Sequence, residues 1–116
     1  MSAGRYNIIC EAGATLTRQL LWKDGAGNPV NLTNYTARMQ VKFEAIQTAA
    51  LLLELSTANG RITLGGILGT IALNVAAIDT RIVPGRYLYD LEMEAIGGKV
   101  TRLVSGAFVV VAEVTT

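Results

Sequence analysis

The sequence predicts an all-β domain, an antiparallel β-sandwich of about 7–8 strands with one short helical turn. Two observations favour this fold. Apolar and polar side chains alternate with a period of two in several segments, as they do in a strand with one buried face. Clusters of Gly, Pro, Asn and Asp interrupt these segments roughly every 8 to 15 residues, which is the spacing of a sandwich. The 116 residues are expected to form one domain, 1–116, because this length supports a single two-layer core.

The first two strands are expected before residue 24. Residues 5–11 form the first, and an Ala-Gly-Ala sequence ends it. Residues 15–23 form the second, although Arg18 interrupts its apolar side and leaves the inward face poorly defined. Residues 24–29 combine Asp, two glycines, Asn and Pro, which is a dense turn signal, and residues 30–32 extend beyond it.

Residues 35–43 show the cleanest alternation in the chain. The side chains assigned to the inward face are Tyr35, Ala37, Met39, Val41 and Phe43. Residues 44–55 are ambiguous between a short helix and a loop followed by a strand at 51–55. The loop and strand are favoured, because residues 56–60 form a turn and residues 61–64 resume a β pattern.

A turn and a short helix are expected on either side of the next strand. Residues 65–69 form the glycine-rich turn, and residues 70–75 form a strand with Ile71, Leu73 and Val75 inward. Residues 76–82 fit one or two helical turns, which Pro84 ends. A helix at this point is a common way for a Greek-key sandwich to cross between its sheets.

The segment 83–111 predicts a turn, a strand, a hairpin and a returning strand. Its inward side chains are Tyr87, Tyr89, Leu91 and Met93. Gly97 and Gly98 are expected to supply the positive φ angles of a two-residue hairpin turn. Residues 109–114 form a nearly pure apolar strand, for which residues 6–10 are the nearest candidate partner. At least one of these two terminal strands is expected to lie at an intersubunit contact, because it would otherwise leave an open edge.

Composition indicates a protein that works while bound to neighbours. Apolar residues make up 51% of the chain and charged residues only 16%, a high apolar share for a monomer in water. The net charge of +1 and the absence of any Lys/Arg cluster along the sequence argue against nucleic acid. No apolar run approaches the roughly 18 to 20 residues of a membrane span. The N-terminus lacks a signal-peptide h-region, so we expect no Sec export and synthesis in a reducing cytoplasm.

The residue inventory predicts no catalytic, cofactor-binding or metal-binding residue, no cofactor, and no enzymatic activity. The chain contains no histidine, which removes the commonest general base and transition-metal ligand. Its only cysteine, Cys10, is expected to be a small core residue rather than a reactive thiol.

Four patterns carry a functional alternative. Asp90, Glu92 and Glu94 project from one strand face at steps of roughly 7 Å and could form part of a Ca²⁺ site. Cross-strand ion pairing with the basic face of Arg38, Gln40 and Lys42 is favoured instead. Residues 65–70 are glycine-rich but lack the lysine of a P-loop, so they are interpreted as a turn.

The other two patterns involve asparagine and aromatic residues. Asn31 and Asn34 each begin a glycosylation sequon, but turn chemistry is the favoured role in the absence of a signal peptide. Trp22 and the four tyrosines could form a sugar-stacking platform. Tyr87 and Tyr89 are interpreted as core residues, which leaves Trp22 as the best candidate for such a platform.

Three motifs make the chain similar to a known family. These are W-K-D-x-x-G-x-P-V-x-L-T-x-Y at 22–35, P-G-x-Y-x-Y-D-L-E at 84–92 and G-x-V-T-R-L at 98–103. The chain resembles, over nearly its whole length, small structural proteins of tailed bacteriophages and prophages, in particular the immunoglobulin-like N-terminal domain of phage baseplate upper proteins. The resemblance implies an immunoglobulin-like fold and a virion protein present in several copies around a symmetry axis.

The function expected from these observations is that of a tail or baseplate adaptor or connector that attaches fibres or spikes. The chain stops at Thr116, without the long C-terminal extension of some relatives, which favours such an adaptor over a receptor-binding role. Its expected partners are other virion proteins (tail, baseplate, fibre or capsid subunits) and copies of itself, with no nucleic acid and no membrane. Its expected location is the virion. The alternatives are a capsid decoration (cement) protein and a carbohydrate- or host-surface-binding module.

Overall fold

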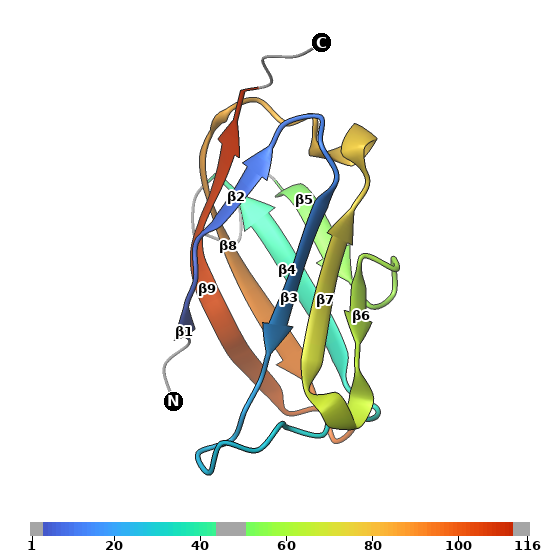
Figure 1. The fold of residues 1–116 in the computed structure, drawn as a ribbon. Coiled ribbons are helices and arrows are strands. Elements are labelled where there is room, and N and C mark those ends of the chain that lie inside the picture. Colours follow the sequence, from blue (N-terminus) through green and yellow to red (C-terminus); the bar gives the residue numbers. More distant parts are fainter. Residues whose placement is uncertain (1–3, 44–50, 113–116) are drawn as a thin grey trace.

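Two β-sheets pack face to face in the computed structural model, which describes residues 4–43 and 51–112 (Figure 1). The larger sheet contains β1 (Gly4–Arg5), β2 (Ile8–Glu11), β4 (Thr36–Lys42), β5 (Leu51–Ser56), β8 (Gly85–Glu94) and β9 (Val100–Val111). The smaller sheet contains β3 (Leu16–Leu21), β6 (Ile62–Leu64) and β7 (Thr70–Val75). Two short 3-10 helices, η1 (Gly66–Leu68) and η2 (Ala77–Thr80), flank β7. The β-sandwich predicted from the sequence is therefore confirmed.

The strand order is immunoglobulin-like. The larger sheet has the order β1-β9-β8-β4-β5, with β2 also paired to β9, and the smaller sheet has the order β3-β7-β6. This is the division of an immunoglobulin sandwich, and the chain changes sheet between β2 and β3, β3 and β4, β5 and β6, and β7 and β8. At the last of these changes the Tyr87 hydroxyl donates a hydrogen bond to the backbone oxygen of Val83, four residues upstream. Such a tyrosine corner is typical of this fold.

The first strand expected from the sequence is divided into two segments. β1 and β2 both pair with β9 in parallel orientation, so this edge of the otherwise antiparallel sandwich departs from the prediction. Between them, the Asn7 side chain accepts a hydrogen bond from the Ala107 amide (3.0 Å), and the Tyr89 hydroxyl donates to the Tyr6 carbonyl. β9 is thus paired on both sides, and its predicted pairing with the N-terminal strand is confirmed.

The hairpin between β8 and β9 has a three-residue loop, so the predicted two-residue turn is wrong. The Ala95 amide donates to the Lys99 carbonyl, and the Gly98 amide donates to the Ala95 carbonyl, both at 2.9 Å. Only Gly98 of the glycine pair has a positive φ, 92°. This arrangement is a β-turn followed by a left-handed glycine, the usual form of a three-residue hairpin loop.

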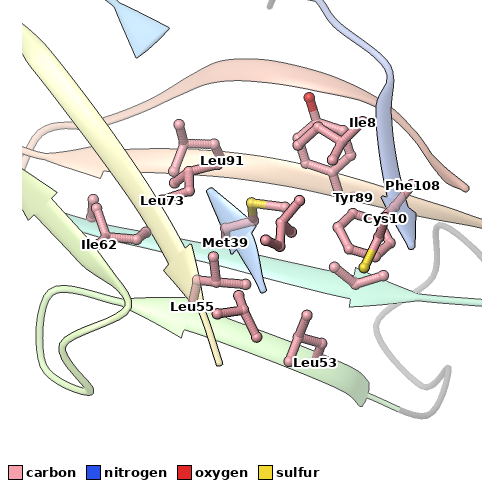
Figure 2. Packing of buried hydrophobic residues seen from close by; sticks show 14 of the residues in the cluster. Ile8, Cys10, Met39, Leu53, Leu55, Ile62, Leu73, Tyr89, Leu91 and Phe108 are labelled. Carbon is pink, nitrogen blue, oxygen red and sulfur yellow. The ribbon is translucent and has the colours of Figure 1, made fainter. Parts of the chain in front are cut away.

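The core lies between the two sheets and contains the side chains that the alternation assigned to it (Figure 2). Met39 and Leu91 are fully buried and face each other in the β4–β8 register. Tyr87 and Tyr89 are 4% and 5% exposed, which confirms them as core residues. Phe43 is the exception, because β4 ends one residue before it. Its ring is 67% exposed and contacts Tyr87 edge to face.

Arg18 interrupts the apolar side of β3 because it lies at an open seam of the sandwich. β3 is an edge strand of the smaller sheet, and β2 lies at the edge of the larger sheet. The Arg18 guanidinium donates to the Ile9 carbonyl of β2 at 2.8 Å and to the Thr17 carbonyl at 2.7 Å. A long side chain can bury its stem and keep its charge near water at such a seam, so Arg18 shares the inward face of β3 with Leu16 and Leu20.

The connections between strands follow the turn signals of the sequence. Asp24 accepts hydrogen bonds from the Ala26 and Asn28 amides in the 24–29 turn. Asn31 accepts from the amide and hydroxyl of Thr33, and Asn34 has a left-handed φ of 66°, which confirms their turn chemistry. The strand predicted at 51–55 is β5, whereas the loop expected at 44–50 lies outside the described residues.

The helical turn predicted at 76–82 is η2, and the glycine-rich turn at 65–69 contains η1. The buried Thr80 hydroxyl accepts a hydrogen bond from the Gly13 amide (3.1 Å) and donates to the Ala14 carbonyl (2.7 Å). This contact fixes η2 against the turn between β2 and β3. Within residues 4–43 and 51–112, no helix has the length and apolar character needed to cross a bilayer.

Candidate functional site

The cysteine lies in the core, where it has no partner for a disulfide. Cys10 is fully buried on the inward face of β2, as predicted. Burial raises the pKa of its thiol; the nearby Arg18 guanidinium partly offsets this, and the Glu11 carboxylate adds a smaller increase. A buried thiol with a raised pKa is a poor nucleophile. Cys10 therefore serves packing.

The acidic row of β8 is joined to a basic residue of the neighbouring strand. Arg102 on β9 contacts the Asp90 carboxylate at 3.3 Å and the Glu92 carboxylate at 4.0 Å. In the sheet register Glu92 lies opposite Arg38 and Asp90 lies opposite Gln40, as the predicted cross-strand pairing requires. Within the described part of the chain, no three acidic, histidine or cysteine side chains gather closely enough to hold a metal ion.

The outer face of the larger sheet carries an open groove of about 450 Å³ that contains most of the charge of this face. Half of the ten basic residues of the chain line it: Arg5, Arg38, Lys42, Arg86 and Arg102. Two acidic residues also line it, and both are the carboxylates that Arg102 contacts. The groove crosses β1, β9, β8 and β4, which are adjacent in the sheet.

The outer face of the smaller sheet carries no charged side chain in β3, β6 or β7. Alternation with the buried positions of these strands places only small or uncharged residues there. They are Thr17, Gln19, Leu21, Thr63, Thr70, Ala72 and Asn74. The two broad faces of the sandwich therefore differ in character, one charged and one neutral.

Large apolar side chains are exposed at both ends of the sandwich. At one end are Ile67 and Leu68 of η1 and Ile96 of the β8–β9 hairpin, with 72%, 62% and 81% exposure. At the other end are η2 and the loop that follows it (Figure 1). Ile78 of η2 and Val83 of that loop are 73% and 75% exposed. Exposed apolar groups that gather at particular places on a surface mark sites of contact with other molecules.

A second groove, of about 780 Å³, is lined by Trp22, the residue that the sequence singles out as a platform for sugar stacking. Tyr35 lies beside Trp22 with their ring centroids 5.9 Å apart and the ring planes almost perpendicular. Arg5, Lys99 and Arg102 also line this groove, and no acidic residue does. Sequence reasoning found the tryptophan but missed the groove, because its walls come from three separate segments of the chain.

Tyr89 is expected to make the stability of the protein fall in alkaline solution. Burial raises the pKa of Tyr89 from the ordinary value of 10.0 to about 12, with a smaller contribution from Tyr6. The unfolded chain loses the Tyr89 proton near pH 10 and the folded chain near pH 12. This contribution to the free energy of unfolding is therefore complete below pH 10 and is lost as the pH rises to 12. The loss in the free energy of unfolding is about 3 kcal/mol. Urea denaturation at several pH values checks this, and Tyr89→Phe is expected to lack this part of the pH dependence.

Comparisons with known proteins give no family. No protein-family model matches the chain, and no curated protein is significantly similar to it. Among solved structures, the chain is similar to CopC from Methylosinus trichosporium OB3b, with a TM-score of 0.49 and 13% identity over 99% of this chain and 90% of that chain. Murine CRIg gives a TM-score of 0.39 and 8% identity over 92% of each chain. Drosophila OTK extracellular domains 3–5 give a TM-score of 0.39 and 14% identity over 90% of this chain and 32% of that chain. Similarities this distant carry no inference about function.

Proposed function

We propose that the chain is a non-enzymatic structural protein of a bacteriophage virion, an adaptor of the tail or baseplate that attaches fibres or spikes. The three motifs of the sequence that resemble baseplate upper proteins support the virion role. In this structure they lie on the 22–35 segment beside η1, on β8 and on the β8–β9 hairpin with the start of β9. The first and third therefore border the end of the sandwich where Ile67 and Ile96 are exposed.

The observation that carries the proposal is the exposed apolar surface at opposite ends of a stiff, elongated module. The molecule measures 44 × 28 × 25 Å. A sandwich with apolar groups at both ends can bury one end against each of two neighbours, which is the geometry of a connector. The gain from such burial is about 25 cal/mol for each Å² of apolar surface removed from water.

Edge strands offer a second means of attachment. β1 and β2 form one edge of the larger sheet, and β3 forms an edge of the smaller sheet. An edge strand presents unpaired backbone amides and carbonyls that can bind a strand of another chain. Of the two terminal strands, the N-terminal one is the better placed for the proposed intersubunit contact, because β9 already has partners on both sides.

Substitution of the apolar ends tests the proposal. Ile67→Ser with Leu68→Ser, and separately Ile78→Ser with Val83→Ser, are expected to leave the free energy of unfolding within about 0.5 kcal/mol per substitution, because these side chains are exposed. Each pair is expected to prevent incorporation into phage particles, measured by mass spectrometry of purified virions. The matched control is Leu88→Ser, which removes a partly exposed apolar side chain from the middle of the larger sheet.

Three results would contradict the adaptor role. The first is a chain absent from purified virions and strictly monomeric by light scattering. The second is normal incorporation of both serine pairs. The third is a location among the major capsid subunits in a virion map, which would make the chain a decoration protein instead.

A further inference from the structure

The groove beside Trp22 has an aromatic wall held in a fixed position. The Trp22 amide donates to the Gly69 carbonyl and the Val30 amide donates to the Trp22 carbonyl, both at 2.9 Å. A methyl group at Gly69 would lie 2.8 Å from the Trp22 carbonyl, so the backbone of η1 and that of Trp22 are in close contact. Tyr35 packs edge to face against the indole. The wall is therefore preorganised, and a ligand need not order it.

The groove also has three basic side chains in its lining. Arg5, Lys99 and Arg102 come from β1, the β8–β9 hairpin and β9, and they face no acidic residue among the side chains that line the groove. Arg102 also contacts Asp90 and Glu92 on the outer face of the larger sheet. Within residues 4–43 and 51–112, Arg5 and Lys99 have no carboxylate within 4.0 Å, so their charges are available to a bound anion.

This combination selects the chemistry of the ligand. An aromatic wall packs against the apolar face of a ring, and Thr101 and Ser105 in the groove supply hydroxyl groups. Basic side chains with no acidic neighbour bind a carboxylate through charge-assisted hydrogen bonds. A nucleic acid needs a longer basic track than one groove with three cations. A flexible acidic peptide would use the cations but has no ring to pack on Trp22 and Tyr35.

We infer that this groove binds an acidic saccharide, with separate uronate carboxylates held by Lys99 and by Arg5 and an apolar face of a sugar ring packed against Trp22. The volume of about 780 Å³ lies within the range of small-ligand sites. The inference assigns a ligand site that the adaptor role neither requires nor excludes, so the two proposals succeed or fail separately.

The single tryptophan of the chain makes the test direct. Because Trp22 is the only indole, its fluorescence reports occupation of this groove. Titration with trigalacturonate is expected to give a saturable change in Trp22 emission and a matching heat in calorimetry, with maltotriose as the neutral control. Lys99→Glu is expected to weaken binding by at least about tenfold, because it replaces a cation at the carboxylate by an anion. Arg81→Glu makes the same change of charge at an exposed position outside the groove.

Specific outcomes would overturn the inference. Trigalacturonate that gives neither an emission change nor a heat at millimolar concentration excludes the site. Equal affinity for maltotriose excludes the acidic class, and equal losses in Lys99→Glu and Arg81→Glu indicate attraction by overall charge instead of a site. Tighter binding of a hexaglutamate peptide than of trigalacturonate would assign the groove to an acidic protein segment. Lys99 is exposed, and circular dichroism of each variant confirms that it is folded.

Discussion

Leu91→Ala is expected to lower the free energy of unfolding by about 2–5 kcal/mol. Leu91 lies in the middle of β8, is fully buried, and pairs across the sheet with Met39, which is also fully buried. Truncation removes apolar contacts and leaves a cavity that the surrounding strands cannot fill, because both sheets fix the backbone around it. Urea denaturation of the variant measures the loss as a shift in the transition midpoint at unchanged slope.

Glu92→Ala is the matched control, one position along the same strand. Its side chain lies on the outer face, and its ion pair with Arg102 is long, at 4.0 Å. Exposed ion pairs of this kind contribute little, so the change is expected to stay within about 0.5 kcal/mol. Similar losses in the two variants would mean that the inward and outward faces of β8 have been assigned the wrong way round.

The alternating patterns predicted the interior of the sandwich well, for a physical reason. A strand with one buried face must place apolar side chains at every second position, and β4, β7 and β8 do so without interruption in their buried segments. The buried residues of these strands are those that the sequence assigned inward, apart from the ends. Alternation therefore identifies both the strand and its buried face wherever both flanks of the strand are paired.

Edges and turns were less predictable, because alternation does not report which strand lies alongside. Arg18 interrupts its pattern because β3 has an open edge beside the seam of the two sheets. The division of the first strand at Tyr6 and Asn7 depends on contacts with Tyr89 and Ala107, which are distant in the sequence. Phe43 continues the alternation in the sequence, but the strand ends at Lys42.

The candidate sites were hidden from the sequence for a related reason. Basic residues that occur singly along the chain, such as Arg5, Arg38 and Arg102, meet on one face only through the sheet order β1-β9-β8-β4. The groove beside Trp22 also depends on the distant hairpin that carries Lys99. The sequence identified Trp22 as a candidate platform, but only the tertiary arrangement brings basic side chains into the same groove.

Gly106→Ala is expected to lower the free energy of unfolding by about 2–4 kcal/mol. A Cβ atom at this position would lie 2.4 Å from the Tyr6 carbonyl oxygen and 3.0 Å from the Asn7 side-chain oxygen. The first contact is with backbone, so it cannot be relieved by rotation of a side chain. Relief requires the segment between β1 and β2 to move away from β9, which breaks hydrogen bonds on both sides of the glycine.

Gly97→Ala is the control, because its added methyl group would meet no atom within 4 Å and its φ is not positive. That variant is expected to be as stable as the parent protein, or slightly more stable through the reduced entropy of its unfolded chain.

A second measurement separates displacement of the N-terminal segment from general destabilisation. Tyr89 pairs with Gly106 in the sheet and donates its hydroxyl to Tyr6. Displacement of that segment exposes the phenol to water, so the pKa of Tyr89 in folded Gly106→Ala is expected to fall from about 12 toward the ordinary value of 10.0. An unchanged ultraviolet titration together with unchanged stability would show that the first strand segment is not held tightly against β9.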